Sequence, residues 1–192
     1  MRRLSNRSAR SKETPIRRRH TVVEYVSLLE STFAIRLLPP WGKILRSRVS
    51  KRPKIHLTDT GIAARLLHIK AEQLIALEPS ALTEFGHLLE TFVVNELIKQ
   101  ATWLDGITGW YHWHTYDHIE VDMILERDDG YIIGIEVKSG TRISQDDMYP
   151  LKKLRDKVGN IFLCGVVLYL GERSYRYEND LYVFPVDRLW QA

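Results

Sequence analysis

The sequence contains almost no cysteine and no apolar run of membrane-spanning length. Cys164 is the single cysteine among 192 residues, so neither a disulfide nor a cysteine-rich zinc site can form within the chain. This composition is typical of proteins in a reducing cytoplasm, where we expect this one. The longest apolar stretch, residues 161–170, is too short to cross a bilayer, so we expect no membrane association.

Acidic residues are scarce in the first part of the chain. Residues 1–55 hold 15 Lys and Arg against 3 Asp and Glu, a net charge of +12, whereas residues 56–192 hold 13 against 21, a net charge of −8. A basic head on an acidic body suggests a polyanionic partner, and DNA comes first. A solvated, partly disordered arm explains residues 1–19 equally well. The candidate nucleic-acid contacts are Arg17, Arg18, Arg19, Lys43, Arg46, Arg48, Lys51 and Arg52.

Local patterns then predict a helix followed by a two-stranded ribbon. Thr21 and Glu24 have the spacing of a capping box, which predicts that a helix starts there. Residues 33–38 and 55–57 are typical of strands, and the segment between them, 43–54, is strongly basic. A short helix and a ribbon with a basic tip are the outline of a winged helix, although the usual preceding helices are missing.

The rest of the chain alternates helical and strand patterns, which predicts an α/β fold with a mixed central sheet flanked by helices. Strand, helix and strand follow one another from residue 131 to 170, which implies a parallel, right-handed crossover. Pro150 fits its helix only in the first turn, and residues 181–190 predict an edge strand with a short helical turn. The expected helices are 60–68, capped by Thr58 and Asp59, 84–100 and 144–158, and the other expected strands are 110–114, 116–126, 131–139 and 161–170. The expected parts are a basic mobile tail at 1–19, a partial winged-helix-like segment at 20–69 and the α/β body at 70–192.

The hairpin at residues 116–139 carries the most distinctive pattern. Both arms alternate apolar and polar residues with a period of two, and Asp-Asp-Gly at 128–130 predicts a three-residue turn. This turn places Asp122 opposite Glu136 and Glu120 opposite Lys138, so their side chains share a face. We expect one apolar face and one polar face, on which the carboxylates and the ammonium gather around Gly134.

Two carboxylates that meet across a strand pair form an all-oxygen site suited to Mg²⁺. Asp122 and Glu136 would hold the metal, and Lys138 could orient a metal-bound water and stabilise charge on a phosphate. Glu90 could add a further carboxylate, although the helical period slightly favours Glu96 as the inward-facing one. The simpler alternative is a solvated ion pair between Glu120 and Lys138.

Three motifs resemble the PD-(D/E)XK, or restriction-endonuclease-like, superfamily: Gly86-x3-Glu90-x2-Val93, Glu120-Val121-Asp122 and Ile135-Glu136-Val137-Lys138-Ser139. The chain is more closely similar to a domain of unknown function found at the C-terminus of many prokaryotic AAA-type ATPases. Residues 54–61 and 21–30 are similar to the upstream part of that family, which is described as winged-helix. The resemblance implies that Glu90 is the helix carboxylate, Asp122 and Glu136 are metal ligands, and Lys138 is the catalytic lysine.

The function implied is Mg²⁺- or Mn²⁺-dependent hydrolysis of DNA phosphodiesters. The sequence has no Gly-x4-Gly-Lys-Ser/Thr loop, so we expect no ATP-binding residues and no ATP hydrolysis. Besides DNA, an ATPase domain or another protein is a possible partner. Two alternatives stay open: a non-catalytic DNA- or protein-docking module of such an ATPase, and a protein-interaction remnant.

A zinc site is conceivable where three histidines alternate with aromatic residues, at His112, His114 and His118. Strand surface is the favoured interpretation for all three. Cys164 lies in an apolar run without a basic neighbour, so we expect it in the core.

Overall fold

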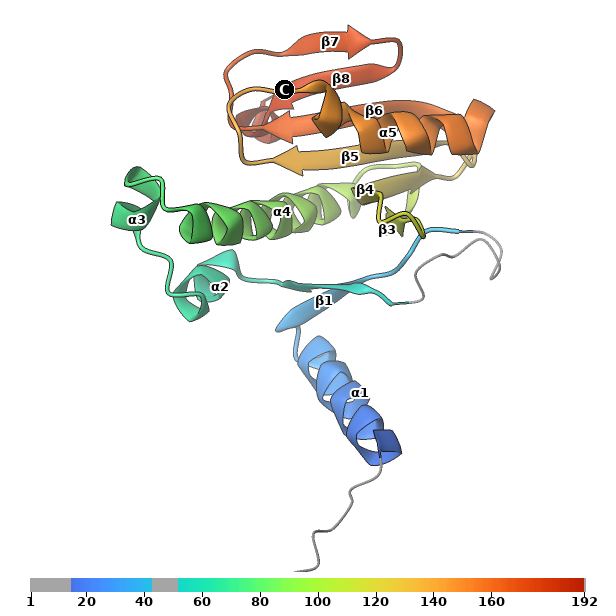
Figure 1. Ribbon diagram of the computed structural model, residues 1–192. Helices are drawn as coiled ribbons and strands as arrows, with labels where there is room; N and C mark the ends of the chain where they lie inside the picture. The colour runs from blue at the N-terminus through green and yellow to red at the C-terminus, as the bar shows by residue number, and fades with distance from the viewer. Residues whose placement is uncertain (1–14, 43–51, 192) are drawn as a thin grey trace, which may run out of the picture.

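A six-stranded mixed sheet forms the body of the protein in this computed structural model, which describes residues 15–42 and 52–191 (Figure 1). The strand order is β3-β4-β5-β6-β8-β7, with β5, β6 and β8 parallel and the other neighbours antiparallel. The predicted α/β class and mixed sheet are therefore confirmed. The strands are β3 Ile107–His114, β4 Glu120–Arg127, β5 Ile132–Lys138, β6 Phe162–Tyr169, β7 Tyr175–Glu178 and β8 Leu181–Pro185.

Two long helices cover opposite faces of this sheet: α4, Pro79–Ala101, and α5, Gln145–Val158. Met123 and Ile135 join the core cluster beneath α4, whereas Ile124 and Ile132 join the cluster beneath α5. Both faces of the hairpin are therefore buried, and the prediction of one polar face around Gly134 is wrong. A Cβ atom on Gly134 would lie 2.9 Å from a methyl carbon of Leu151 and 3.0 Å from one of Leu154, so glycine is what lets α5 approach the strand.

The predicted turn and register of the hairpin are confirmed. Gly130 has φ of +84°, and its N–H donates to the carbonyl of Arg127 at 3.0 Å. Met123 pairs with Ile135 and Leu125 with Ile133, as the three-residue turn requires.

Most helix starts also follow from local chemistry. Asp59 caps α2, Thr60–Leu66, by accepting from the N–H of Ile62 at 3.0 Å, and Ser144 caps α5 in a capping box with Asp147.

The prediction that Pro150 lies in the first turn of its helix is wrong, because this residue lies inside α5 beyond that turn. The hydrogen bond that Pro150 cannot make would have gone to the carbonyl of Asp146, an exposed residue of the first turn that water can reach.

Two further boundaries differ from prediction. The strand at Leu181–Pro185 is not an edge strand, because β7 pairs with its outer side. Sequence reasoning missed β7, which alternates aromatic and charged residues but over only four positions. Helix α4 begins at Pro79 rather than Glu84, because proline at the first helical position needs no hydrogen-bond partner for its nitrogen.

The N-terminal part contains α1, Pro15–Ser31, and a ribbon of β1, Ile35–Leu38, and β2, Lys54–Leu57. The predicted helix and ribbon are confirmed, but the helix begins at Pro15, so Thr21 is not its cap. The ribbon joins the body where the N–H of Trp41 donates to the carbonyl of His112 at 2.7 Å. A short helix, α3, Ala71–Ile75, leads into α4. Within the described residues, no helix is both long and apolar enough to span a membrane.

Candidate functional site

A bulge in β4 orients Asp122. Tyr111 pairs with Ile124 and Trp113 with Val121, so Asp122 and Met123 together oppose a single residue of β3. The ladder between β4 and β5 ends at Met123, and beyond that point Asp122 Oδ2 accepts a hydrogen bond from the N–H of Val137 at 3.0 Å. The Asp122 carboxylate therefore accepts a hydrogen bond from β5 at the point where the backbone ladder between the two strands has ended. Its other oxygen, Oδ1, remains free to bind a cation.

That other oxygen faces the ammonium group of Lys54, which comes from the ribbon. Lys54 Nζ lies 2.6 Å from Glu120 Oε1, 2.7 Å from Glu90 Oε1 and 3.2 Å from Asp122 Oδ1. Burial alone would lower the pKa of Lys54, but the three carboxylates outweigh it and raise that pKa above its ordinary value. We call Lys54, Glu90, Glu120 and Asp122 the carboxylate cluster. Sequence reasoning missed Lys54, because no local signal links it to acids so distant in the chain.

Of the two glutamates that could supply the helix carboxylate, Glu90 lies beside Asp122 and Glu96 does not. Glu90 enters the cluster, whereas Glu96 pairs with Lys99 of its own helix at 2.5 Å. Burial raises the pKa of Glu90, the neighbouring Asp122 adds to the rise, and Lys54 opposes it. The role of Glu90 as a metal ligand stays a prediction.

Glu136 is the most deeply buried carboxylate near the cluster, with a side chain 3% exposed. Its Oε2 lies 3.1 Å from Lys138 Nζ, and its buried Oε1 has no hydrogen-bond partner among the described residues. Burial raises the pKa of Glu136 well above its ordinary value, and Asp122 adds to the rise. The alternative ion pair of Glu120 with Lys138 is not formed, because the ribbon brings Lys54 to Glu120 and Lys138 lies against Glu136.

A cavity of about 550 Å³ opens beside the cluster and is also lined by His56 and Thr91. His56 Nδ1 lies 3.1 Å from Thr91 Oγ1, and burial lowers the pKa of His56 to about 4, helped by the charge of Lys54. The imidazole is therefore neutral at physiological pH. Its Nε2 is buried and has no partner in the part of the chain that the structure describes.

The donor set can be tested against a divalent cation. Carboxylate oxygens are the ligands that Mg²⁺ and Mn²⁺ prefer, and the orphaned Oε1 of Glu136 beside Asp122 fits such an ion. In the described residues, however, no three His, Cys, Asp or Glu side chains are arranged to hold a metal ion. The ammonium of Lys54 takes the cationic position between Glu90 and Asp122.

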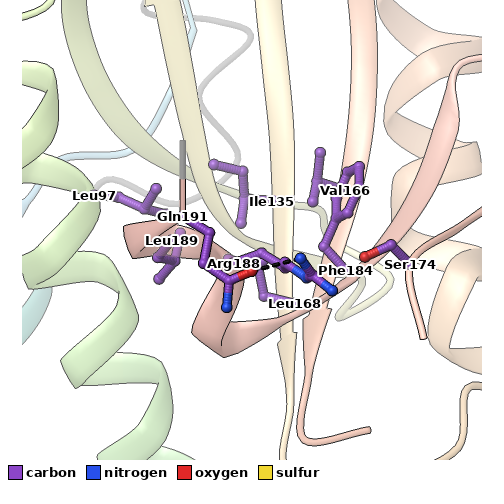
Figure 2. A pocket seen from close by; sticks show the side chains of 9 residues that line it. All are labelled: Leu97, Ile135, Val166, Leu168, Ser174, Phe184, Arg188, Leu189 and Gln191. Atoms are coloured by element: carbon purple, nitrogen blue, oxygen red, sulfur yellow. Dashed lines mark hydrogen bonds between the residues drawn. The ribbon is translucent and has the colours of Figure 1, made fainter. Parts of the chain in front are cut away.

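Figure 2 shows a second cavity of about 550 Å³, on the α4 face of the sheet. Its walls are mainly apolar side chains of α4, β5, β6 and β8, and Arg188 is the single charged residue among those that line it. A cavity without a carboxylate cannot hold Mg²⁺ through carboxylate ligands, so the carboxylate cluster is the better candidate for metal chemistry.

A family model described as "Domain of unknown function (DUF4143)" matches residues 85–189, which include most of α4, the hairpin and the rest of the sheet. The chain belongs to the DUF4143 family. A second model, "Domain of unknown function (DUF8612)", matches residues 3–73.

Two curated relatives of this DUF4143 chain are each described as an uncharacterized protein, one from Mycobacterium bovis and one from Mycobacterium tuberculosis. Each is 26% identical over 170 residues, which are 88% of this chain and 35% of the relative. The chain therefore spans about a third of the length of the curated relatives it matches.

The three histidines of this DUF4143 chain that could form a zinc site divide into two groups. His112 is buried, and its Nε2 lies 3.2 Å from the carbonyl oxygen of Arg52, so the expectation of strand surface is wrong for this residue. His114 and the exposed His118 stack edge to face with ring centroids 5.8 Å apart. Zinc finds no support in the described residues. Cys164 is half-buried, and burial raises the pKa of its thiol.

The predicted DNA contacts stay predictions. Lys43, Arg46, Arg48 and Lys51 lie outside the described residues, and Arg17, Arg18 and Arg19 belong to the first turns of α1. Arg52 is exposed where the chain enters β2.

Proposed function

We propose that this chain hydrolyses DNA phosphodiesters with the help of Mg²⁺ or Mn²⁺. The observation that carries the proposal is the buried Glu136 carboxylate, whose Oε1 has no partner among the described residues although it lies beside Asp122. A buried carboxylate is costly unless it is paired with positive charge, and Lys138 reaches only the other oxygen of Glu136, Oε2, at 3.1 Å. A divalent ion held by Asp122 and Glu136, with Glu90 completing the site, would balance the charges.

A bound divalent ion would polarise a phosphate oxygen and lower the pKa of a coordinated water. Lys138 is held against Glu136 and is 30% exposed, so its ammonium can orient the attacking water and stabilise charge on the phosphate. His56 is neutral and lines the cavity, where it can donate or accept a hydrogen bond. Lys54 holds Glu90 and Asp122 together, and metal binding would have to displace its ammonium.

We assign the body to the PD-(D/E)XK fold and residues 20–69 to a winged-helix-like segment. A mixed sheet with a helix on each face, and a hairpin bearing an aspartate and a Glu-x-Lys sequence, support the first assignment. The helix and the ribbon support the second. DNA would be held by the basic head, through phosphate contacts that release counterions.

A second function has its own support. Lys54 already neutralises part of the carboxylate cluster, so the site is held together without metal. The match to this chain covers 35% of each curated relative, so the rest of each relative is long enough to contain a further domain. These two observations favour a non-catalytic docking module that binds DNA or an ATPase domain.

Cleavage of supercoiled plasmid and of branched DNA in Mn²⁺ or Mg²⁺ separates the two functions. Hydrolysis predicts that Asp122→Asn loses Mn²⁺ binding in calorimetry, and that Lys138→Ala keeps it while cleavage falls by about 100-fold or more, since that interaction acts mainly in the transition state. Glu96→Gln is the matched control for Glu90→Gln on the same helix. If the wild type neither cleaves DNA nor binds Mn²⁺, hydrolysis is wrong and the docking module is the function that remains.

A further inference from the structure

A third cavity, of about 810 Å³, lies between α5 and the turn that joins β3 to β4. Its lining residues include Trp113, Tyr116, Ile119, Tyr149, Lys153 and Lys157. Aromatic rings and lysines thus share one hollow, a combination that is typical of surfaces on which unpaired bases stack.

The aromatic rings are available to a ligand. Tyr116 is 78% exposed on the turn and Tyr149 is 47% exposed on α5, whereas Trp113 is buried and forms the floor. Exposed tyrosines at the edge of a hollow leave apolar ring faces in water, and a stacked planar ligand would cover them.

The cations lie beside these rings. Lys153 Nζ is 5.5 Å from the centroid of the Tyr149 ring, and Lys157 Nζ is 5.6 Å from that of Trp113. Residues 149, 153 and 157 are four apart, so they form one stripe along α5. Neither lysine forms an ion pair with another described residue, whereas Lys152 pairs with Glu178 at 2.8 Å.

Two acids also line the cavity. Asp156 lies 3.9 Å from Arg155 of its own helix, and Asp117 is exposed on the turn. Neither pairs with Lys153 or Lys157, so both ammonium groups stay available for a phosphate.

The cavity and the carboxylate cluster share the start of β4. Ile119 lines the cavity and the next residue, Glu120, binds Lys54, and the two hollows face opposite helices. A nucleic-acid strand that crosses the turn over Tyr116 could therefore place a phosphate at the cluster and a base further along the strand in the cavity. A base inside a duplex is already stacked and could not enter.

We propose that this cavity binds an unpaired base of the DNA strand, so that the substrates are single-stranded or branched DNA. The base stacks on Tyr149 and Tyr116, and Lys153 and Lys157 hold the adjacent phosphates. This inference rests on the proposed function, because it specifies the substrate of the same site.

Anisotropy of a labelled single strand and of the matching duplex, both without divalent metal, tests the inference. Stacking is worth about 1–3 kcal/mol per base, so Tyr116→Ala with Tyr149→Ala should weaken single-strand binding by about 10-fold or more and duplex binding by less than about 2-fold. The double Tyr→Phe variant should bind like the wild type. Tyr131→Ala is the matched control, since Tyr131 is 42% exposed at the other end of the hairpin.

A 2-aminopurine base in the single strand should be quenched by the wild type and not by the double alanine variant. An equal loss of binding in Tyr131→Ala, or none in the double alanine variant, would overturn the subsite. If that happens while the wild type still cleaves DNA in Mn²⁺, the proposed function stands without the subsite. If stacking is observed but nothing is cleaved, the cavity is a binding site and hydrolysis is wrong.

Discussion

Replacing Lys54 by methionine removes the ammonium that three carboxylates share. The change keeps most of the length of the side chain and leaves Glu90, Glu120 and Asp122 together without that cation. The exposed fractions of these side chains are 19%, 38% and 14%, so the cluster is screened by water only in part.

Loss of one partner from a buried ion pair typically costs about 3–5 kcal/mol, and the greater exposure of Glu120 reduces this to about 2–4 kcal/mol here. The direction in which this stability loss changes with pH follows from the acids of the cluster. Burial already raises the pKa of Glu90, and loss of Lys54 would raise it further. An acid whose pKa is higher in the folded state destabilises the protein as pH rises, so the loss should be larger at pH 8 than at pH 5.

Urea denaturation of the wild type and Lys54→Met at both pH values measures this difference. The control is Lys99→Met, which breaks only the pair between Glu96 and the exposed Lys99 and should cost less than about 0.5 kcal/mol. Mn²⁺ should restore stability to Lys54→Met, by about 2.7 kcal/mol at 100 times its Kd. A loss equal to that of the control, with no pH dependence, would refute the role assigned to Lys54.

Three further outcomes are expected. The raised pKa of Glu136 makes the wild type lose stability as pH rises above the ordinary carboxyl pKa, and Glu136→Gln should remove that part of the pH dependence of unfolding. Gly134→Ala places a Cβ 2.9 Å from Leu151 and should lower the free energy of unfolding by about 1–3 kcal/mol, and an unchanged value would mean that α5 does not pack as described. Deletion of residues 1–19 should flatten the salt dependence of DNA affinity, and an unchanged slope would exclude phosphate contacts there.

Local chemistry in the chain was enough to predict several elements. The Asp-Asp-Gly turn and the period of two set the register of the hairpin, because a three-residue loop leaves few pairings open. Asp59 and Ser144 marked the starts of α2 and α5, because a cap is a contact within a few residues.

Tertiary contacts determined the features that local chemistry does not predict. The bulge that orients Asp122 belongs to the pairing of β4 with β3, and no period within β4 indicates it. Lys54 reaches Glu90 and Asp122 across 36 and 68 positions of the chain, because charges attract through space regardless of their order in sequence. The alternation of the hairpin predicts one apolar face and one polar face, but both faces are buried because α4 and α5 pack from opposite directions. Whether a polar strand residue is solvated or buried depends on what packs over it, and that is decided far from the strand itself.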